Sequence, residues 1–191
     1  MMEALVAPSP ETGAAGHERE LLPAGPAGIV VVLVGAALAV ASVAAFGVSG
    51  RALVGVVFCP VLVLLAAIDL KHRLLPNAVV LPAAVLVALV VAAANPGGFL
   101  EHLEAGLALF GFLFLFAAVF PAGLGMGDAK VGLLIGLALG SRTLAAMLAT
   151  SGVAFVAAIW IIARQGLSAR KQSIPFGPYL ALGGILAFFL G

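Results

Sequence analysis

Apolar stretches of about 20 residues recur along this chain and constrain its fold more than any other feature. At about 1.5 Å per residue, a helix of that length crosses a hydrocarbon core about 30 Å thick. Because 64% of the 191 residues are hydrophobic and 9% are charged, a water-soluble fold could not hide the apolar surface. Residues 28–45 are apolar on every side, whereas barrel strands alternate polar and apolar residues. The sequence predicts an all-α bundle of membrane-spanning helices.

Polar residues, glycines and prolines divide the apolar sequence into about six to seven expected transmembrane helices. Residues 128–162 are too long for one crossing and are interrupted only at Ser141 and Arg142, so we expect a short helix followed by a full one. The expected spans are 28–48, 52–69, 77–95, 102–121, 128–141, 143–163 and 175–191. Since we find no internal repeat, residues 27–191 are expected to form one membrane-embedded domain.

Residues 1–26 differ from the rest of the chain in composition. They hold four prolines and four glutamates against a single arginine, and so lack the basic start of a secretory signal. We expect this segment to be a flexible cytoplasmic tail.

The basic residues predict the orientation of the helices, because short loops rich in Lys and Arg stay in the cytoplasm. The basic residues that follow the second, fourth and sixth expected spans are Lys71, Arg73, Lys130, Arg164, Arg170 and Lys171. The even-numbered spans therefore end in the cytoplasm. Arg51 and Arg142 fall on the outer side and conflict mildly with this scheme, as single charges.

The two aspartates of the chain, Asp69 and Asp128, both lie at the edges of expected spans. Carboxylates at membrane depth are costly, and their default interpretation is functional. The charge-derived topology places Asp69 at the cytoplasmic end of the second span and Asp128 at the cytoplasmic start of the fifth. The two side chains can therefore meet at one membrane face.

Two close carboxyl groups in a partly dehydrated site share one proton, and their apparent pKa values separate. The ionised group can then take a proton from an attacking water, while the protonated group hydrogen-bonds the developing oxyanion. This chemistry hydrolyses a peptide bond without a metal or a cofactor. We expect no metal site, because the single cysteine, Cys59, lies in an apolar run and the three histidines lack metal-ligand spacing.

Structural interpretations of the same residues remain open. Asp128 could simply be the N-cap of an apolar helix, and Asp69 could end a helix and pair with Lys71 or Arg73. Gly123, Gly125 and Gly127 could be ordinary turn residues, or could adopt a positive φ that lets the backbone approach a substrate. For the nearby Lys130, an anchor in the headgroups is a commoner role than catalysis.

Three segments of the chain resemble the type IV prepilin peptidases, the bacterial branch of the GxGD membrane aspartyl proteases. They are IDLKHRLLPN at residues 68–77, GMGDAK at 125–130 and IPFGPYLALGG at 174–184, in that order. The resemblance implies that Asp69 and Asp128 are the catalytic pair. The motif residues that would support them or bind substrate are Pro76, Asn77, Gly125, Gly127 and Lys130.

The resemblance also implies a substrate and a location. The substrate would be a prepilin or pseudopilin, whose short basic leader ends in glycine before a hydrophobic helix and is cleaved at the cytoplasmic face of the bacterial inner membrane. Larger family members carry an N-terminal region with paired cysteines that binds zinc and is linked to methylation. Because this chain has no such cysteines, it resembles a peptidase-only member.

Two other functions compete with this interpretation. A small proton-coupled transporter or channel could use Asp69 and Asp128 as a proton relay. Against it, the sequence shows no repeated halves, and both acids are expected at one surface. A purely structural scaffold would leave the paired aspartates unexplained. The expected partners are the pilin-like substrate and membrane lipids, with no nucleic acid and with the oligomeric state left open.

Overall fold

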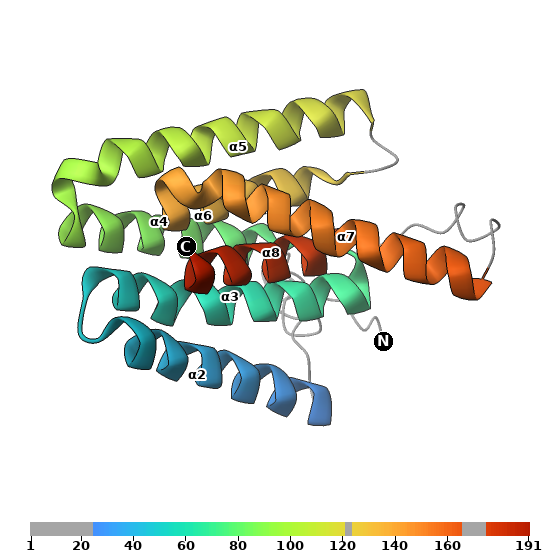
Figure 1. The fold of residues 1–191 in the computed structure, drawn as a ribbon, viewed down its shortest axis with the longest axis horizontal. Coiled ribbons are helices and arrows are strands. Elements are labelled where there is room, and N and C mark those ends of the chain that lie inside the picture. The colour runs from blue at the N-terminus through green and yellow to red at the C-terminus, as the bar shows by residue number, and fades with distance from the viewer. Residues whose placement is uncertain (1–24, 121–123, 166–174) are drawn as a thin grey trace, which may run out of the picture.

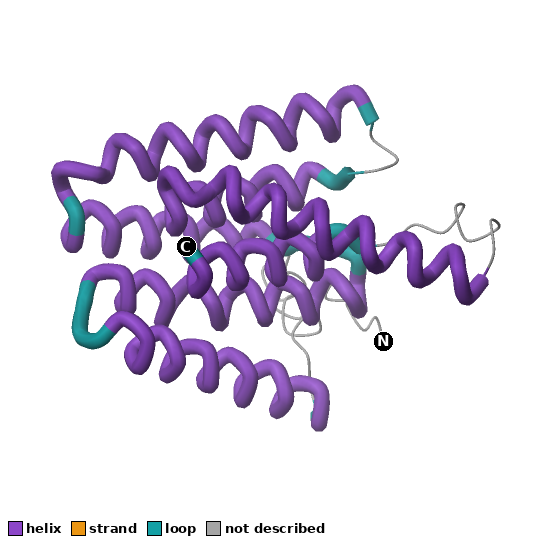
Figure 2. The backbone as a smooth tube through the Cα atoms, in the orientation of Figure 1, coloured by secondary structure: helices purple, strands orange, loops and turns teal. Residues whose placement is uncertain are grey.

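The computed structural model describes residues 25–120, 124–165 and 175–191, and within these ranges the chain forms helices and no strand (Figure 2). The α-helices are α2 (Pro26–Phe46), α3 (Gly50–His72), α4 (Asn77–Ala94), α5 (Phe99–Val119), α6 (Met126–Leu139), α7 (Thr143–Gln165) and α8 (Gly177–Leu190). Two short 3₁₀ helices, η1 (Pro96–Gly98) and η2 (Gly140–Arg142), precede α5 and α7. The all-α prediction is confirmed. The expected tail, residues 1–26, lies outside the described residues except for Gly25 and Pro26.

Consecutive helices run in opposite directions along the bundle (Figure 1). Helices α3, α5 and α7 therefore end where α4, α6 and α8 begin. We name this the aspartate end, because Asp69 lies in the last turn of α3 and Asp128 in the first turn of α6. The connections α2–α3, α4–α5 and α6–α7 lie at the opposite end, which we name the far end (Figure 1).

Five helical stretches among the described residues are long and apolar enough to cross a membrane, and one of them, Met126–Arg164, has 39 residues. That stretch is divided at Gly140, whose φ of 56° reverses the chain between α6 and α7. Helix α8 is a shorter apolar helix of 14 residues. The predicted division near Ser141 and Arg142 is confirmed, and the chain is a multi-pass membrane protein.

The start of α5 differs from the prediction, because the helix begins at Phe99 instead of residue 102. The Asn95 side chain accepts a hydrogen bond from the Gly98 N–H at 3.1 Å and so caps η1, which continues directly into α5. Glu101 and His102 therefore occupy the first turn of the helix. The capped 3₁₀ turn thus adds Phe99, Leu100 and Glu101 to the helix ahead of its expected start.

Helix α3 likewise extends beyond its expected end at residue 69. It ends at His72, and Arg73 caps it in the left-handed conformation with a φ of 53°. The Arg73 N–H donates to the Asp69 carbonyl at 2.8 Å, which closes the last turn. Asp69 is consequently held inside a helical turn.

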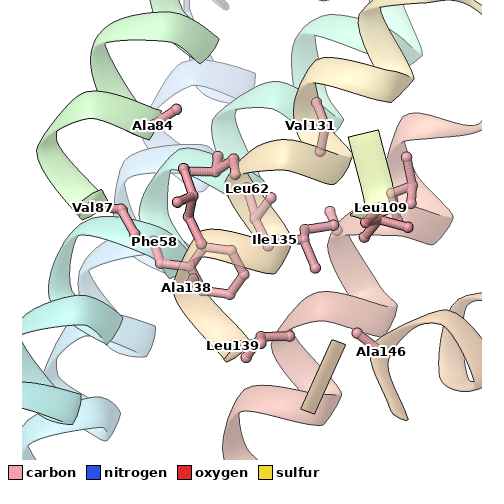
Figure 3. Packing of buried hydrophobic residues seen from close by; sticks show 14 of the residues in the cluster. Phe58, Leu62, Ala84, Val87, Leu109, Val131, Ile135, Ala138, Leu139 and Ala146 are labelled. Carbon is pink, nitrogen blue, oxygen red and sulfur yellow. The ribbon is translucent and has the colours of Figure 1, made fainter. Parts of the chain in front are cut away.

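Helix α6 lies at the centre of the bundle, since ten of its 14 residues are buried. Figure 3 shows its side chains among those of the surrounding helices α3, α4, α5 and α7. The labelled residues of this core are Phe58, Leu62, Ala84, Val87, Leu109, Val131, Ile135, Ala138, Leu139 and Ala146. Helix α2 is peripheral by comparison, because it buries only Gly35 and Ser42.

Glycines stand where neighbouring helices approach most closely. The pairs are Gly35 with Pro60 between α2 and α3, Gly55 with Phe188 between α3 and α8, Gly106 with Gly136 between α5 and α6, and Gly183 with Thr150 between α7 and α8. In lipid, apolar side chains gain little by leaving their surroundings, so helices associate through close van der Waals packing at small residues. These contacts specify which faces of the helices meet.

We expect Gly136→Ala to destabilise the bundle. An added Cβ would meet the Gly106 backbone, with the Ala105 carbonyl oxygen at 2.6 Å, so α5 and α6 would have to separate. The free energy of unfolding should fall by about 1–3 kcal/mol, measured by unfolding in detergent. The matched control is Gly111→Ala on α5, where no atom lies within 4 Å of the added Cβ. Equal stability of the two variants would contradict the close contact.

Candidate active site

Asp69 is buried in the last turn of α3, with 6% of its surface exposed. Its Oδ2 accepts a hydrogen bond from the Gly177 N–H at 2.9 Å. Gly177 is the first residue of α8, where the backbone N–H groups have no partner inside the helix and attract an anion. This hydrogen bond ties the end of α3 to the start of α8, and Asp69 forms no ion pair with the described Lys71 or Arg73.

Asp128 is buried to the same degree, with 7% of its surface exposed. It is the third residue of α6, and its Oδ2 accepts from the N–H of Gly125, the N-cap residue, at 2.9 Å. The Asp128 N–H donates in turn to the Gly125 carbonyl at 3.1 Å. Asp128 therefore caps its helix from inside the first turn, as an acidic third residue does in a capping box, and is not itself the N-cap.

The two carboxyl groups lie close enough for their charges to interact. The expectation that Asp69 and Asp128 lie at one end of the bundle is thus confirmed, and their role as a catalytic pair stays a prediction. Each carboxylate uses Oδ2 to accept a backbone hydrogen bond, and no donor to either Oδ1 is found in residues 25–120, 124–165 and 175–191. One oxygen of each group is therefore left for a proton, a water or a substrate. The expectation that the site needs no metal stays a prediction.

The segment between α3 and α4 packs on the start of α6. The Lys130 Nζ donates to the Asn77 Oδ1 at 2.6 Å, which joins α6 to the first residue of α4. A Cβ on Gly127 would lie 2.8 Å from the Leu75 Cβ. Because glycine has no side chain, Leu75 can pack directly on the first turn of α6. Pro76 is the N-cap residue of α4, with a φ of −69°.

The positive-φ interpretation of the glycines before Asp128 is wrong where the structure describes them. Gly125 is an extended N-cap with a φ of −86°, and Gly127 is helical. Gly125 contributes its N–H to Asp128, and Gly127 contributes space for Leu75. The preceding Gly123 lies outside the described residues.

Gly177 is the site residue that the sequence interpretation missed, although it lies in the third quoted segment. It contributes a backbone N–H, which every residue except proline carries, so the residue type alone does not indicate that this position binds the Asp69 carboxylate. One signal was present. A glycine directly before Pro178, at the start of an apolar helix, indicates a close backbone contact, and a Cβ there would lie 2.6 Å from the Asp69 Oδ2.

Comparison with known proteins adds an independent finding. Residues 56–162 match a family described as the type IV leader peptidase family. The chain is 32% identical over 171 residues to the prepilin leader peptidase/N-methyltransferase of Burkholderia pseudomallei strain 1026b, covering 85% of this chain and 54% of that protein. It is 36% identical over 166 residues to the Bacillus subtilis strain 168 protein of the same name, covering 83% of this chain and 64% of that protein. This chain thus spans between about half and two thirds of these relatives, and no solved structure matches it significantly.

We expect Gly177→Ala to destabilise the protein through Asp69. The added Cβ would lie 2.6 Å from the Oδ2 and 3.0 Å from the Cγ of Asp69, so carboxylate and helix must move apart. In an Asp69→Ala background both atoms are absent, and the same substitution should cost less. A double-mutant cycle of unfolding in detergent should give a coupling energy of roughly 0.5–3 kcal/mol.

The matched control for that cycle is Gly152→Ala on α7, where no atom lies within 4 Å of an added Cβ. Gly152→Ala should show no coupling to Asp69→Ala. Additive effects of Gly177→Ala and Asp69→Ala would mean that the α8 backbone does not hold the carboxylate.

Proposed function

The chain belongs to the type IV leader peptidase family, and we propose that it is a membrane aspartic endopeptidase that removes the leader from type IV prepilins or pilin-like precursors. The observation that carries this proposal is the pair of buried carboxyl groups that α3 and α6 bring together at one end of the bundle. The names of the relatives in Burkholderia pseudomallei and Bacillus subtilis support the same activity.

In the proposed mechanism, Asp69 and Asp128 share one proton. Two carboxylates that repel each other in a partly dehydrated site favour the singly protonated state. The ionised group takes a proton from the attacking water, while the protonated group donates a hydrogen bond to the carbonyl oxygen of the scissile bond. A carboxyl proton then passes to the leaving amine as the C–N bond breaks. The N–H groups of Gly177 and Gly125 hold the Oδ2 atoms, which leaves the Oδ1 atoms for this chemistry.

The proposed substrate reaches the site from the membrane surface. A prepilin has a basic leader followed by a hydrophobic helix, so the helix can remain in lipid while the leader junction meets carboxyl groups at the bundle end. Asp69 and Asp128 lie at such an end and not at mid-bundle, which also lowers the support for a proton-relay transporter.

We further propose that the aspartate end faces the cytoplasm. The described basic residues at this end are Lys71, Arg73, Lys130 and Arg164. Positive charge close to the spans favours retention on the cytoplasmic side. The same residues can hold the site against anionic headgroups. The expected contributions of Arg170 and Lys171 lie outside the described residues.

We expect Asp69→Asn and Asp128→Asn each to lower leader cleavage by about 100-fold or more, because general acid–base catalysis supplies about that factor. The chain is co-expressed with a candidate prepilin, and leader loss is followed by gel shift and mass spectrometry at matched membrane levels. The control is Glu104→Gln, which changes an exposed carboxylate at the far end and should cleave normally. Native-rate cleavage by either aspartate variant would overturn the assignment and reopen the proton-relay alternative.

The orientation is tested by cysteine labelling. Lys71→Cys lies at the aspartate end and Gly97→Cys in η1 at the far end, and both positions are exposed. The native Cys59 is fully buried and should not react. In intact cells, a membrane-impermeant maleimide should label Gly97→Cys, and should label Lys71→Cys only after lysis. The reverse pattern would place the aspartate end outside the cytoplasm.

A further inference from the structure

A second polar site lies at the far end of the bundle, away from the two aspartates. A cavity of about 260 Å³ opens there between the ends of α3, α4, α5, α6 and α8, beside η2. Its polar lining residues are Arg51, Asn95, His102 and Arg142, and its apolar lining includes Val54, Val91 and Leu139. The proposed hydrolysis uses none of these residues.

Two contacts hold the Arg51 guanidinium in place, and they do not use all of its N–H donors. Its guanidinium lies over the Phe46 ring, 3.9 Å from the centroid, and its Nη2 donates to the Phe188 carbonyl. The Nε is buried and has no hydrogen-bond partner among the described residues. The Nε has too little exposed surface to be reached from the cavity, so the donors that remain for an acceptor there are those of the two Nη atoms, of which one bonds the Phe188 carbonyl.

The cavity also concentrates positive charge. Arg51 and Arg142 lie close enough for their charges to repel each other, and neither forms an ion pair with a carboxylate in the described parts of the chain. Glu101 is near Arg142, but its Oε1 accepts from the Ser141 N–H at 2.8 Å and it does not line the cavity. An anion between the two arginines would relieve this repulsion.

His102 adds a further polar atom to the lining. Its Nδ1 lies 2.9 Å from the Leu137 carbonyl, and because a carbonyl oxygen only accepts, Nδ1 is the donor. Its Nε2 is therefore the ring atom left for a ligand, and it becomes a donor when the imidazole is protonated. Arg51, Arg142 and His102 come from three different elements of the bundle.

We propose that this cavity binds a phosphate group, carried by an anionic phospholipid or by a soluble phosphate. Arginine guanidinium groups match phosphate oxygens in charge and geometry. The cavity is smaller than the roughly 300–1,000 Å³ pockets that enclose whole drug-sized ligands, so it suits a headgroup. It lies where the spans end, at the depth of lipid headgroups, and its apolar lining can take the adjoining glycerol carbons.

The test uses the 191-residue chain purified in detergent. Native mass spectrometry with added phosphatidylglycerol measures lipid adducts per chain, and calorimetric titration with inorganic phosphate measures binding of the soluble anion. We expect a saturable site for at least one of the two. Lipid binding alone identifies a headgroup site, and binding of inorganic phosphate identifies a site open to soluble anions.

The variants locate the binding. Arg142→Gln should weaken it about tenfold, which is the loss expected for one charge-assisted hydrogen bond. Arg51→Gln should do the same, and if Arg51→Gln does not fold, Arg51→Lys, which keeps the charge but loses the planar guanidinium donors, should also weaken binding. The matched control is Arg164→Gln, which removes an exposed arginine at the aspartate end. Absence of saturable binding, or an equal loss in Arg164→Gln, would overturn the proposal.

Discussion

Close contact between helices at glycines is the constraint on which the rest of this structure depends. Large apolar side chains such as Leu33, Leu86, Leu115 and Phe155 stand exposed on the outside of the bundle, so the membrane itself accepts them. Hydrophobicity alone therefore cannot choose which face of a helix turns inward. Gly136 meets Gly106 and Gly183 meets Thr150 at distances that no other residue type would permit. These contacts, more than the apolar content, orient the helices.

The orientation of the central helix then determines the surroundings of Asp128. Helix α6 has 14 residues, about 21 Å at the usual rise, which is shorter than a hydrocarbon core of about 30 Å. Such a helix is held by its protein neighbours, which bury ten of its residues, and not by matching the thickness of the membrane. Its first turn accordingly packs against the segment between α3 and α4. A carboxylate in this position is partly screened from water without lying at the centre of the bilayer.

The sequence predicted the meeting of Asp69 and Asp128 because only two crossings, by α4 and α5, separate them. Counting crossings settles which end a residue reaches, and it needs no knowledge of side-chain packing. The start of α5 was placed three residues late because Glu101 is polar yet helical and the capped turn η1 leads directly into the helix. The role of Gly127 was missed. The turn and positive-φ interpretations both concerned its own backbone, whereas its role is to make room for Leu75, which comes from a distant part of the chain. Contacts of that kind leave no local pattern in the sequence.

The hydrogen bond from Gly177 to Asp69 has a consequence for the extent of this domain. The stretch that matches the family, residues 56–162, contains both aspartates but stops before α8. A fragment cut at those limits would begin inside α3 and retain two carboxyl groups, with the backbone donor to one of them removed. The structural unit around the aspartates is therefore longer than the segment by which its family is recognised. A backbone hydrogen bond extends this unit to α8, and a comparison of residue types does not detect such a bond.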